Sequence, residues 1–117
     1  KLRSKESLKL QIEFDDRLKD KKIYPLLFTP IVENAFKYVG GEYIIKISMK
    51  LQNDDILYFQ VENSLPEQEP LRKKNASGIG IENLKRRLEL LYPKNHELKL
   101  AKENGNFSAT LTIKFDA

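Results

Sequence analysis

The chain has 117 residues and a formal net charge of +4, with 40% hydrophobic and 32% charged residues. These values are typical of one ordinary globular domain and leave little room for a second. The absence of cysteine excludes disulfides and thiolate metal sites and favours a reducing compartment, and the single histidine, His96, excludes a metal site built from several histidines. No apolar run approaches the roughly 20 residues that a membrane-spanning helix needs.

Strand patterns recur along the chain. Apolar and polar residues alternate from Leu8 to Phe14, which predicts a strand with one face buried. Further alternating runs predict two hairpins, one closed by a turn-like tetrad and the other by Asn104-Gly105, the strongest short hairpin signal. The four strands of these hairpins are expected over residues 43–51, 56–61, 96–102 and 107–115.

Two helices are expected between the strands. Helical periodicity covers residues 24–39, where Pro25 and Pro30 indicate a helix start or a kink. A second, amphipathic helix ends at Pro93, and its apolar side carries Ile81, Leu84, Leu88 and Leu91.

The rest of the chain is expected to form loops. Residues 15–22 are charged, and residues 64–77 form the longest irregular stretch, of the kind that often serves as a lid or a binding loop. The order strand, helix, hairpin, loop, helix, hairpin predicts an α+β fold with residues 1–117 as a single domain. We expect a two-layer sandwich in which both helices cover one face of a mixed, mostly antiparallel sheet.

The first helix carries a polar stripe. Glu33, Asn34 and Lys37 fall within an arc of about 100° on a helical wheel, and apolar residues occupy the other side. One interpretation is a solvated stripe with a Glu33–Lys37 pair at the i,i+4 spacing. The other is a phosphate site, in which the carboxamide holds Mg²⁺, the carboxylate polarises a nucleophile and the lysine neutralises phosphate charge.

The second helix opens with the run Ser77-Gly-Ile-Gly-Ile. Glycines at 78 and 80 let a backbone approach a ligand closely, and a helix N-terminus offers free N–H groups to a phosphate. Between residues 72 and 87 there are six basic residues and one acidic residue, which also suits a phosphate-rich ligand. A plain helix-entry loop followed by an exposed basic helix face explains the same residues.

Two motifs together resemble a known family. PLLFTPIVENAFKY, at residues 25–38, is similar to the N box of sensor histidine kinases of the autolysin-sensor (LytS-like) type. SGIGIENLKRRLELLY, at residues 77–92, is similar to their glycine-rich box, and the two motifs come in the family's order with the expected hairpin and loop between them. The resemblance covers nearly the whole chain, from about residue 8 to residue 115.

The resemblance implies the Bergerat ATP-binding fold, with ATP and Mg²⁺ as cofactors. It makes Glu33 the polarising base and Asn34 the magnesium ligand. The positions that it assigns to nucleotide binding are Asn34, Lys37, Tyr38, Asn63, Lys73, Lys74, Gly78, Ile79 and Gly80.

The sequence also departs from the family pattern. Tyr38 stands where a histidine is usual, and the adenine-reading box appears as Val61-Glu-Asn-Ser-Leu-Pro, with Asn63 in place of its aspartate and without its glycines. An asparagine still accepts a hydrogen bond through its carbonyl oxygen, but it is neutral. Asn83 and Arg87 match the family's N-x-x-x-R-L and are interpreted as architectural, and His96 is expected to be a surface residue.

The resemblance implies an ATP:protein-histidine phosphotransferase. Its acceptor histidine lies on an upstream dimerisation helix, of which residues 1–7 are interpreted as a remnant. The implied setting is the cytoplasmic side of a membrane-anchored, homodimeric bacterial protein that signals to a DNA-binding response regulator and does not itself bind nucleic acid. The alternative is a degenerate module that senses nucleotide or pairs with a partner kinase without phosphotransfer.

Overall fold

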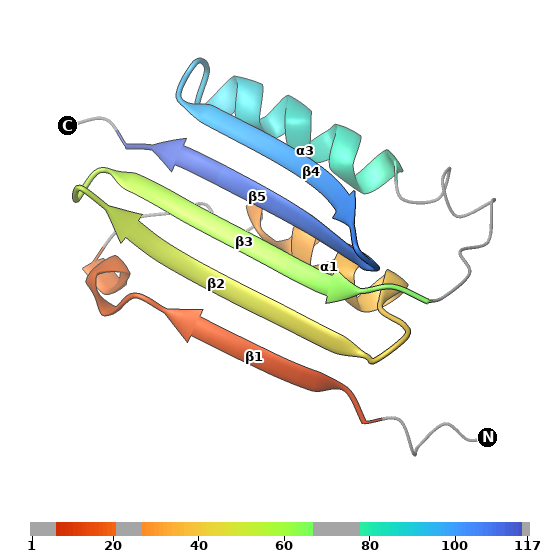
Figure 1. The fold of residues 1–117 in the computed structure, drawn as a ribbon. Coiled ribbons are helices and arrows are strands. Elements are labelled where there is room, and N and C mark those ends of the chain that lie inside the picture. Colours follow the sequence, from red (N-terminus) through yellow and green to blue (C-terminus); the bar gives the residue numbers. More distant parts are fainter. Residues whose placement is uncertain (1–6, 21–26, 67–77, 116–117) are drawn as a thin grey trace.

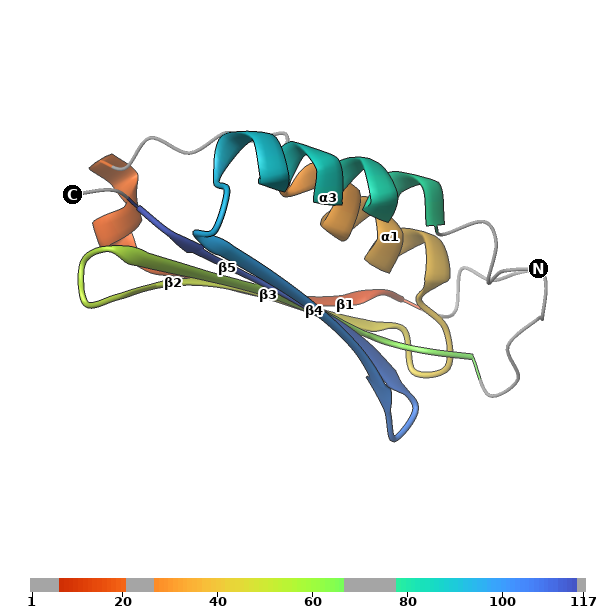
Figure 2. The same ribbon diagram turned by 90° about the horizontal axis from the view of Figure 1, so that it is seen from above.

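The computed structural model describes residues 7–20, 27–66 and 78–115 of the chain. Five strands form one sheet in the order β1-β2-β3-β5-β4, and two helices lie together on one of its faces (Figures 1 and 2). The strands are β1 (Lys9–Phe14), β2 (Ile44–Gln52), β3 (Ile56–Ser64), β4 (His96–Glu103) and β5 (Asn106–Lys114). The helices are α1 (Thr29–Tyr38) and α3 (Gly78–Leu91), and a short 3-10 helix, η2, spans Asp16–Asp20.

Only β1 and β2 run parallel, and the other three strand pairs are antiparallel. The predicted two-layer α+β sandwich with a mixed, mostly antiparallel sheet is therefore confirmed. The predicted hairpins are present, and their turns follow from local chemistry: Asn53 and Asp54 close β2–β3 with positive φ, as Asn104 and Gly105 close β4–β5. Left-handed residues at both central positions match the twist of hairpin strands.

The core lies between the helix layer and the sheet. The ring of Phe28, just before α1, lies on that of Phe59 in β3, with centroids 4.7 Å apart. The buried hydrophobic side chains of this core are Leu18, Leu27, Ile31, Ala35, Ile45, Leu51, Leu57, Phe59, Val61, Leu84, Leu88, Ala109, Leu111 and Ile113. Alternate residues of the three central strands supply most of the sheet side, which is the two-residue period expected of a half-buried sheet.

The prediction that β1 buries one face is wrong. Leu8, Leu10, Ile12 and Phe14 are 40–62% exposed. The alternation correctly places them on the helix side of the sheet, because Leu10 and Ile12 pair with Ile45 and Ile47 of β2. However, β1 is an edge strand, and neither α1 nor α3 lies over it (Figure 1).

Other boundaries differ from expectation by local effects. Of the helix expected over residues 24–39, residues 24–26 lie outside the described part of the chain, and α1 begins at Thr29. Pro30 is in its first turn, where the missing N–H costs nothing. β3 continues three residues beyond the expected Val61, and residues 16–20 of the expected loop form η2. The interpretation of residues 1–7 as a helix remnant falls, apart from Ser7, outside the described residues, as does most of the expected lid.

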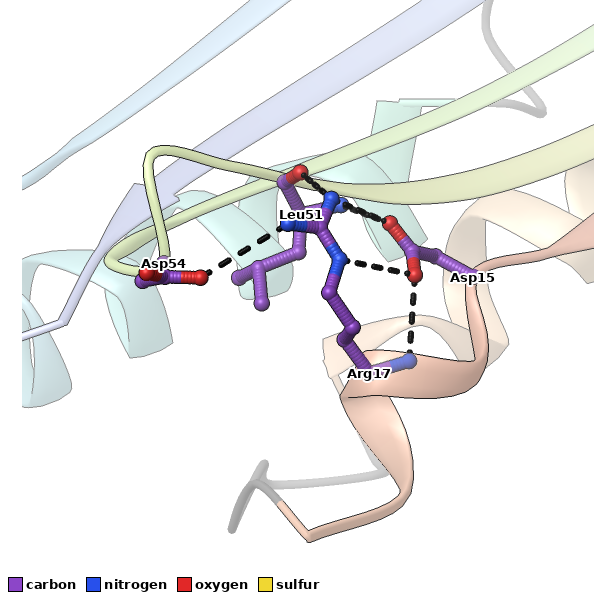
Figure 3. Close-up of polar contacts among 4 residues, drawn as sticks. All are labelled: Asp15, Arg17, Leu51 and Asp54. Carbon is purple, nitrogen blue, oxygen red and sulfur yellow. Dashed lines mark hydrogen bonds and ion pairs between the residues drawn. The ribbon is translucent and has the colours of Figure 1, made fainter.

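A polar cluster fixes the end of β1 to the β2–β3 hairpin (Figure 3). The Asp15 carboxylate accepts hydrogen bonds from the Arg17 side chain at 2.9 Å and from the Leu51 backbone N–H at 3.1 Å. Arg17 in turn donates to the Leu51 carbonyl and lies 3.6 Å from Asp54. Hydrogen bonds from the Arg17 side chain and backbone, and from the Leu51 backbone, hold the pKa of Asp15 well below its usual range.

Candidate functional site

The polar faces of the two helices meet because their apolar faces are taken up by the core. α1 buries Ile31 and Ala35, and α3 buries Leu84 and Leu88. The two helices also contact each other, so the flank of α1 that carries its polar stripe faces α3.

A cleft of about 210 Å³ lies between these flanks. Its walls come from two sequence segments that start 50 residues apart, and each segment belongs to one of the two motifs. The lining residues are Pro30, Glu33, Asn34 and Lys37 of α1 and Gly80, Ile81, Asn83 and Arg87 of α3. The structure thus brings Glu33, Asn34, Lys37 and Gly80 together, as the phosphate-site interpretation requires.

The charges of the cleft are not neutralised internally. Within the described part of the chain, Glu33 and Lys37 form no ion pair, although their i,i+4 spacing allows one. The Lys37 Nζ instead lies 5.6 Å from the ring centroid of Tyr38. With Arg87 opposite, the cleft holds two cationic side chains and one carboxylate. This charge balance favours the interpretation as a site for an anionic ligand over the interpretation as a solvated, salt-bridged stripe.

The first turn of α3 borders the same cleft. Gly78 and Ile79 open the helix and Gly80 follows on the cleft wall. A Cβ added to Gly80 would meet no atom within 4 Å, so the backbone is open to an approaching group at this point. The N–H groups of a helix start have no intrahelical partner and carry partial positive charge, which favours phosphate.

Two other predicted residues lie outside the cleft. Tyr38 follows Lys37 at the end of α1 and is half-buried. Asn63, near the end of β3, is 1% exposed, and its Nδ2 donates a 3.0 Å hydrogen bond to the Ser64 carbonyl. Lys73 and Lys74 fall outside the described residues.

Solved structures share this architecture. The chain matches the histidine kinase AdeS of Acinetobacter baumannii with a TM-score of 0.65 and 13% identity, over 97% of this chain and 57% of that one. It matches the catalytic domain of the histidine kinase ThkA with a TM-score of 0.59 and 16% identity, over 95% and 80% of the two chains. The fold is that of a histidine kinase catalytic domain.

A third match to this kinase fold is full-length ShkA in complex with AMPPNP, with a TM-score of 0.62 and 13% identity, over 97% of this chain and 27% of that one. The present chain therefore spans a little over half of AdeS and about a quarter of ShkA. No protein-family model and no curated protein matches the sequence. Among the described residues, no helix is long and apolar enough to cross a membrane.

Two residues that line the cleft are ones for which the sequence predicts an architectural role. Asn83 and Arg87 were interpreted as architectural, yet both are exposed and line the cleft. Their spacing offers a signal that could have found them, because Gly80, Asn83 and Arg87 follow one another at i, i+3 and i+7 and so share one helix face.

The expectation that His96 is a surface residue is wrong. Its side chain is 14% exposed at the start of β4. The ring Nδ1 lies 2.8 Å from the Tyr92 carbonyl, and Nε2 lies 3.7 Å from a Glu89 carboxylate oxygen. His96 therefore joins the end of α3 to the sheet, and it does not line the cleft.

Proposed function

We propose that this chain is the ATP-binding catalytic domain of a sensor histidine kinase of the autolysin-sensor type. The observation that carries the proposal is the cleft between α1 and α3, which is lined by two amides, a carboxylate, two cations and a glycine in the first turn of a helix. Such a set suits the phosphates of a nucleotide, because phosphoryl transfer depends mainly on positioning and on neutralising charge.

On the phosphate side, each proposed role follows from side-chain chemistry. Asn34 would offer its carboxamide oxygen to Mg²⁺, a hard cation that takes oxygen ligands and keeps water and phosphate oxygens beside them. When bound, Mg²⁺ would supply neutralisation of phosphate charge. Lys37 would contact the phosphates as a mobile point charge and Arg87 as a planar fork. Glu33 would polarise the incoming histidine, and the remaining phosphate contacts are assigned to Gly78, Ile79 and Gly80, with Lys73 and Lys74.

On the adenine side, we assign recognition to Asn63, with Tyr38 as a further contact. The Asn63 amide nitrogen already donates to the Ser64 carbonyl. Its carbonyl oxygen is then the atom suited to accept a hydrogen bond from the adenine amino group. A neutral acceptor gives a weaker bond than the carboxylate of the family pattern, so we expect modest affinity for ATP.

The proposed partner is a histidine on an upstream dimerisation helix of the same protein. In that proposal the full protein is a membrane-anchored homodimer, this domain is on its cytoplasmic side, and the phosphoryl group passes on to a DNA-binding response regulator. The competing hypothesis is a module that senses nucleotide without phosphotransfer, and the second of the two experiments below distinguishes it from a kinase.

The test is a calorimetric titration of the chain with AMPPNP, with and without Mg²⁺. We expect Mg²⁺ to tighten binding, and Asn34→Ala to remove most of that gain. A matched control is Gln60→Ala, which deletes another amide on the opposite face of the sheet and should change nothing. No binding at millimolar nucleotide would sink the proposal.

Phosphotransfer needs a second measurement. A longer protein that includes the upstream helix is incubated with labelled ATP, and label on the acceptor histidine is the expected result. Glu33→Gln should keep nucleotide affinity and lose label. Nucleotide binding without any transfer in the unmodified protein would favour the sensing module.

A further inference from the structure

The outer edge of β1 is an apolar surface without a described cover. Its helix-side residues Leu8, Leu10, Ile12 and Phe14 are all exposed. Phe36 of α1 is also exposed, and it does not line the cleft between α1 and α3. Large apolar patches that stay exposed on a domain commonly mark interaction surfaces.

The backbone of β1 offers a second feature at the same place. β1 bonds to β2 through alternate residues, as in the hydrogen bonds from Lys9 N–H to the Tyr43 carbonyl (2.8 Å) and from Asp15 N–H to the Met49 carbonyl (3.0 Å). The N–H and C=O groups of Leu10 and Ile12 therefore point outward. Among the described residues no strand pairs with this edge, and an unpaired edge is a template for another strand.

The sequence of β1 is complementary to itself. If two copies pair antiparallel about a two-fold axis at Gln11, Lys9 of each copy lies opposite Glu13 of the other. The same register sets Leu10 opposite Ile12, and Leu8 opposite Phe14. Lys9 and Glu13 are on the open face of the sheet in both copies, and the apolar pairs are on the helix side.

The hydrogen-bonding pattern fits this register. Leu10 and Ile12, whose backbone groups point outward, become a directly opposed pair that exchanges both N–H···O bonds. Neighbouring registers place Lys9 opposite Gln11 or Asp15, and they lose the Lys9–Glu13 match. Asp15 is already engaged by Arg17.

We propose that β1 is a self-association surface, through which two copies of this chain join their sheets edge to edge with antiparallel β1 strands. The two helix layers then lie on the same side of a continuous sheet, and the exposed apolar residues of both β1 strands pack together between them. The interface is small, so association is weak and concentration-dependent. It is independent of nucleotide binding and separate from dimerisation through an upstream helix.

A disulfide trap tests the geometry. The chain has no cysteine, so Gln11→Cys introduces one thiol at the two-fold axis. Directly opposed residues of a non-hydrogen-bonded antiparallel pair have Cα atoms roughly 4.5 Å apart, within the range of about 4.4–6.8 Å that disulfides span. Lys99→Cys, exposed on the other edge strand β4, is the matched control. Under mild oxidation we expect rapid covalent dimerisation of Gln11→Cys alone, and equal rates for both variants overturn the proposal.

Charge exchange tests the register. In the Gln11→Cys background, Lys9→Glu and Glu13→Lys each set like charges opposite each other, and each should slow dimerisation by roughly tenfold. A mixture of the two variants, or the double exchange in one chain, restores both pairs and should restore the rate. Circular dichroism checks that each variant is folded. If the mixture cross-links no faster than either variant alone, β1 does not pair in this register and the proposal fails.

Discussion

Replacing Arg87 by alanine separates an architectural role from a ligand contact. Arg87 is exposed on α3 and lines the cleft opposite Asn34 and Lys37. If it contacts phosphate, Arg87→Ala should weaken nucleotide binding and leave the fold intact. If it holds the helix in place, the same change should lower the melting temperature and leave affinity per folded molecule unchanged.

The structure limits the size of the effect. A hydrogen bond to a charged group contributes about 1.5–3 kcal/mol. Because Arg87 is exposed in a cleft that is open to water, we take the lower value, which corresponds to roughly a tenfold loss of affinity. Arg87→Lys keeps the charge without the planar fork and should lose less. Deleting an exposed side chain away from other interactions changes stability by at most about 0.5 kcal/mol.

Arg86→Ala provides the matched control, because it removes the same charge from the neighbouring position, which does not line the cleft. Titration of AMPPNP with Mg²⁺ at two salt concentrations gives the affinities, and thermal melting gives the stabilities. We expect a selective loss for Arg87→Ala that narrows at high salt. Equal losses for the two variants, or a fall in melting temperature with unchanged affinity, would refute the reasoning.

Three further predictions concern single positions. Gly80→Ala should stabilise α3 by up to about 1 kcal/mol, since alanine is the better helix former and its Cβ meets no atom within 4 Å. The same change should weaken AMPPNP binding if phosphate approaches the backbone at this position. Thermal melting measures the first effect and titration with AMPPNP the second. Leu88→Ala, at a side chain with 0% exposure, should cost about 2–5 kcal/mol in urea unfolding, whereas Leu90→Ala, at an 81% exposed side chain, should cost less than about 0.5 kcal/mol. The pKa of Asp15 is lowered in the folded chain. The Asp15 carboxylate therefore stabilises the fold fully above the unfolded pKa of about 4, and this contribution is lost as the pH falls below that value. The urea midpoint should fall less between pH 6 and pH 2.5 in Asp15→Asn than in the unmodified chain.

Local periodicity was enough to predict the five strands and the two α-helices, but not which faces of them are covered. Alternation correctly identified the side of β1 that carries Leu10 and Ile12, because strand side chains change face at every residue. Whether that side is buried depends on long-range topology. β1 comes first in the chain yet pairs in parallel with β2 at the edge of the sheet, and neither α1 nor α3 covers it.

The candidate site was predicted in the same partial way. The stripe of Glu33, Asn34 and Lys37 could be read from α1 alone, but its meaning depended on what faced it. Arg87 supplies that facing group. Its spacing from Gly80 places both on one helix face, but the packing of α3 against α1 determines that this face meets the stripe. His96 was misjudged for a similar reason, since its contact with the Tyr92 carbonyl forms when the chain turns back from α3 into β4.

The two sides of the proposed nucleotide site are joined by the backbone. Gly40, which follows α1, donates a 3.0 Å hydrogen bond to the carbonyl of Ser64, the residue after Asn63. The Ser64 hydroxyl donates to the Gly40 carbonyl at 2.7 Å. This close approach needs glycine, because a Cβ on Gly40 would lie 2.7 Å from the Pro66 ring, and Gly41 has a φ of +61°. These contacts thus fix the end of α1, the helix that carries Asn34, to the end of β3, the strand that carries Asn63. A change that loosens these contacts should therefore reduce both the gain in affinity from Mg²⁺ and the selectivity for adenine. A change at Asn63 alone should lower the affinity and the selectivity for adenine nucleotides and leave the gain from Mg²⁺ intact.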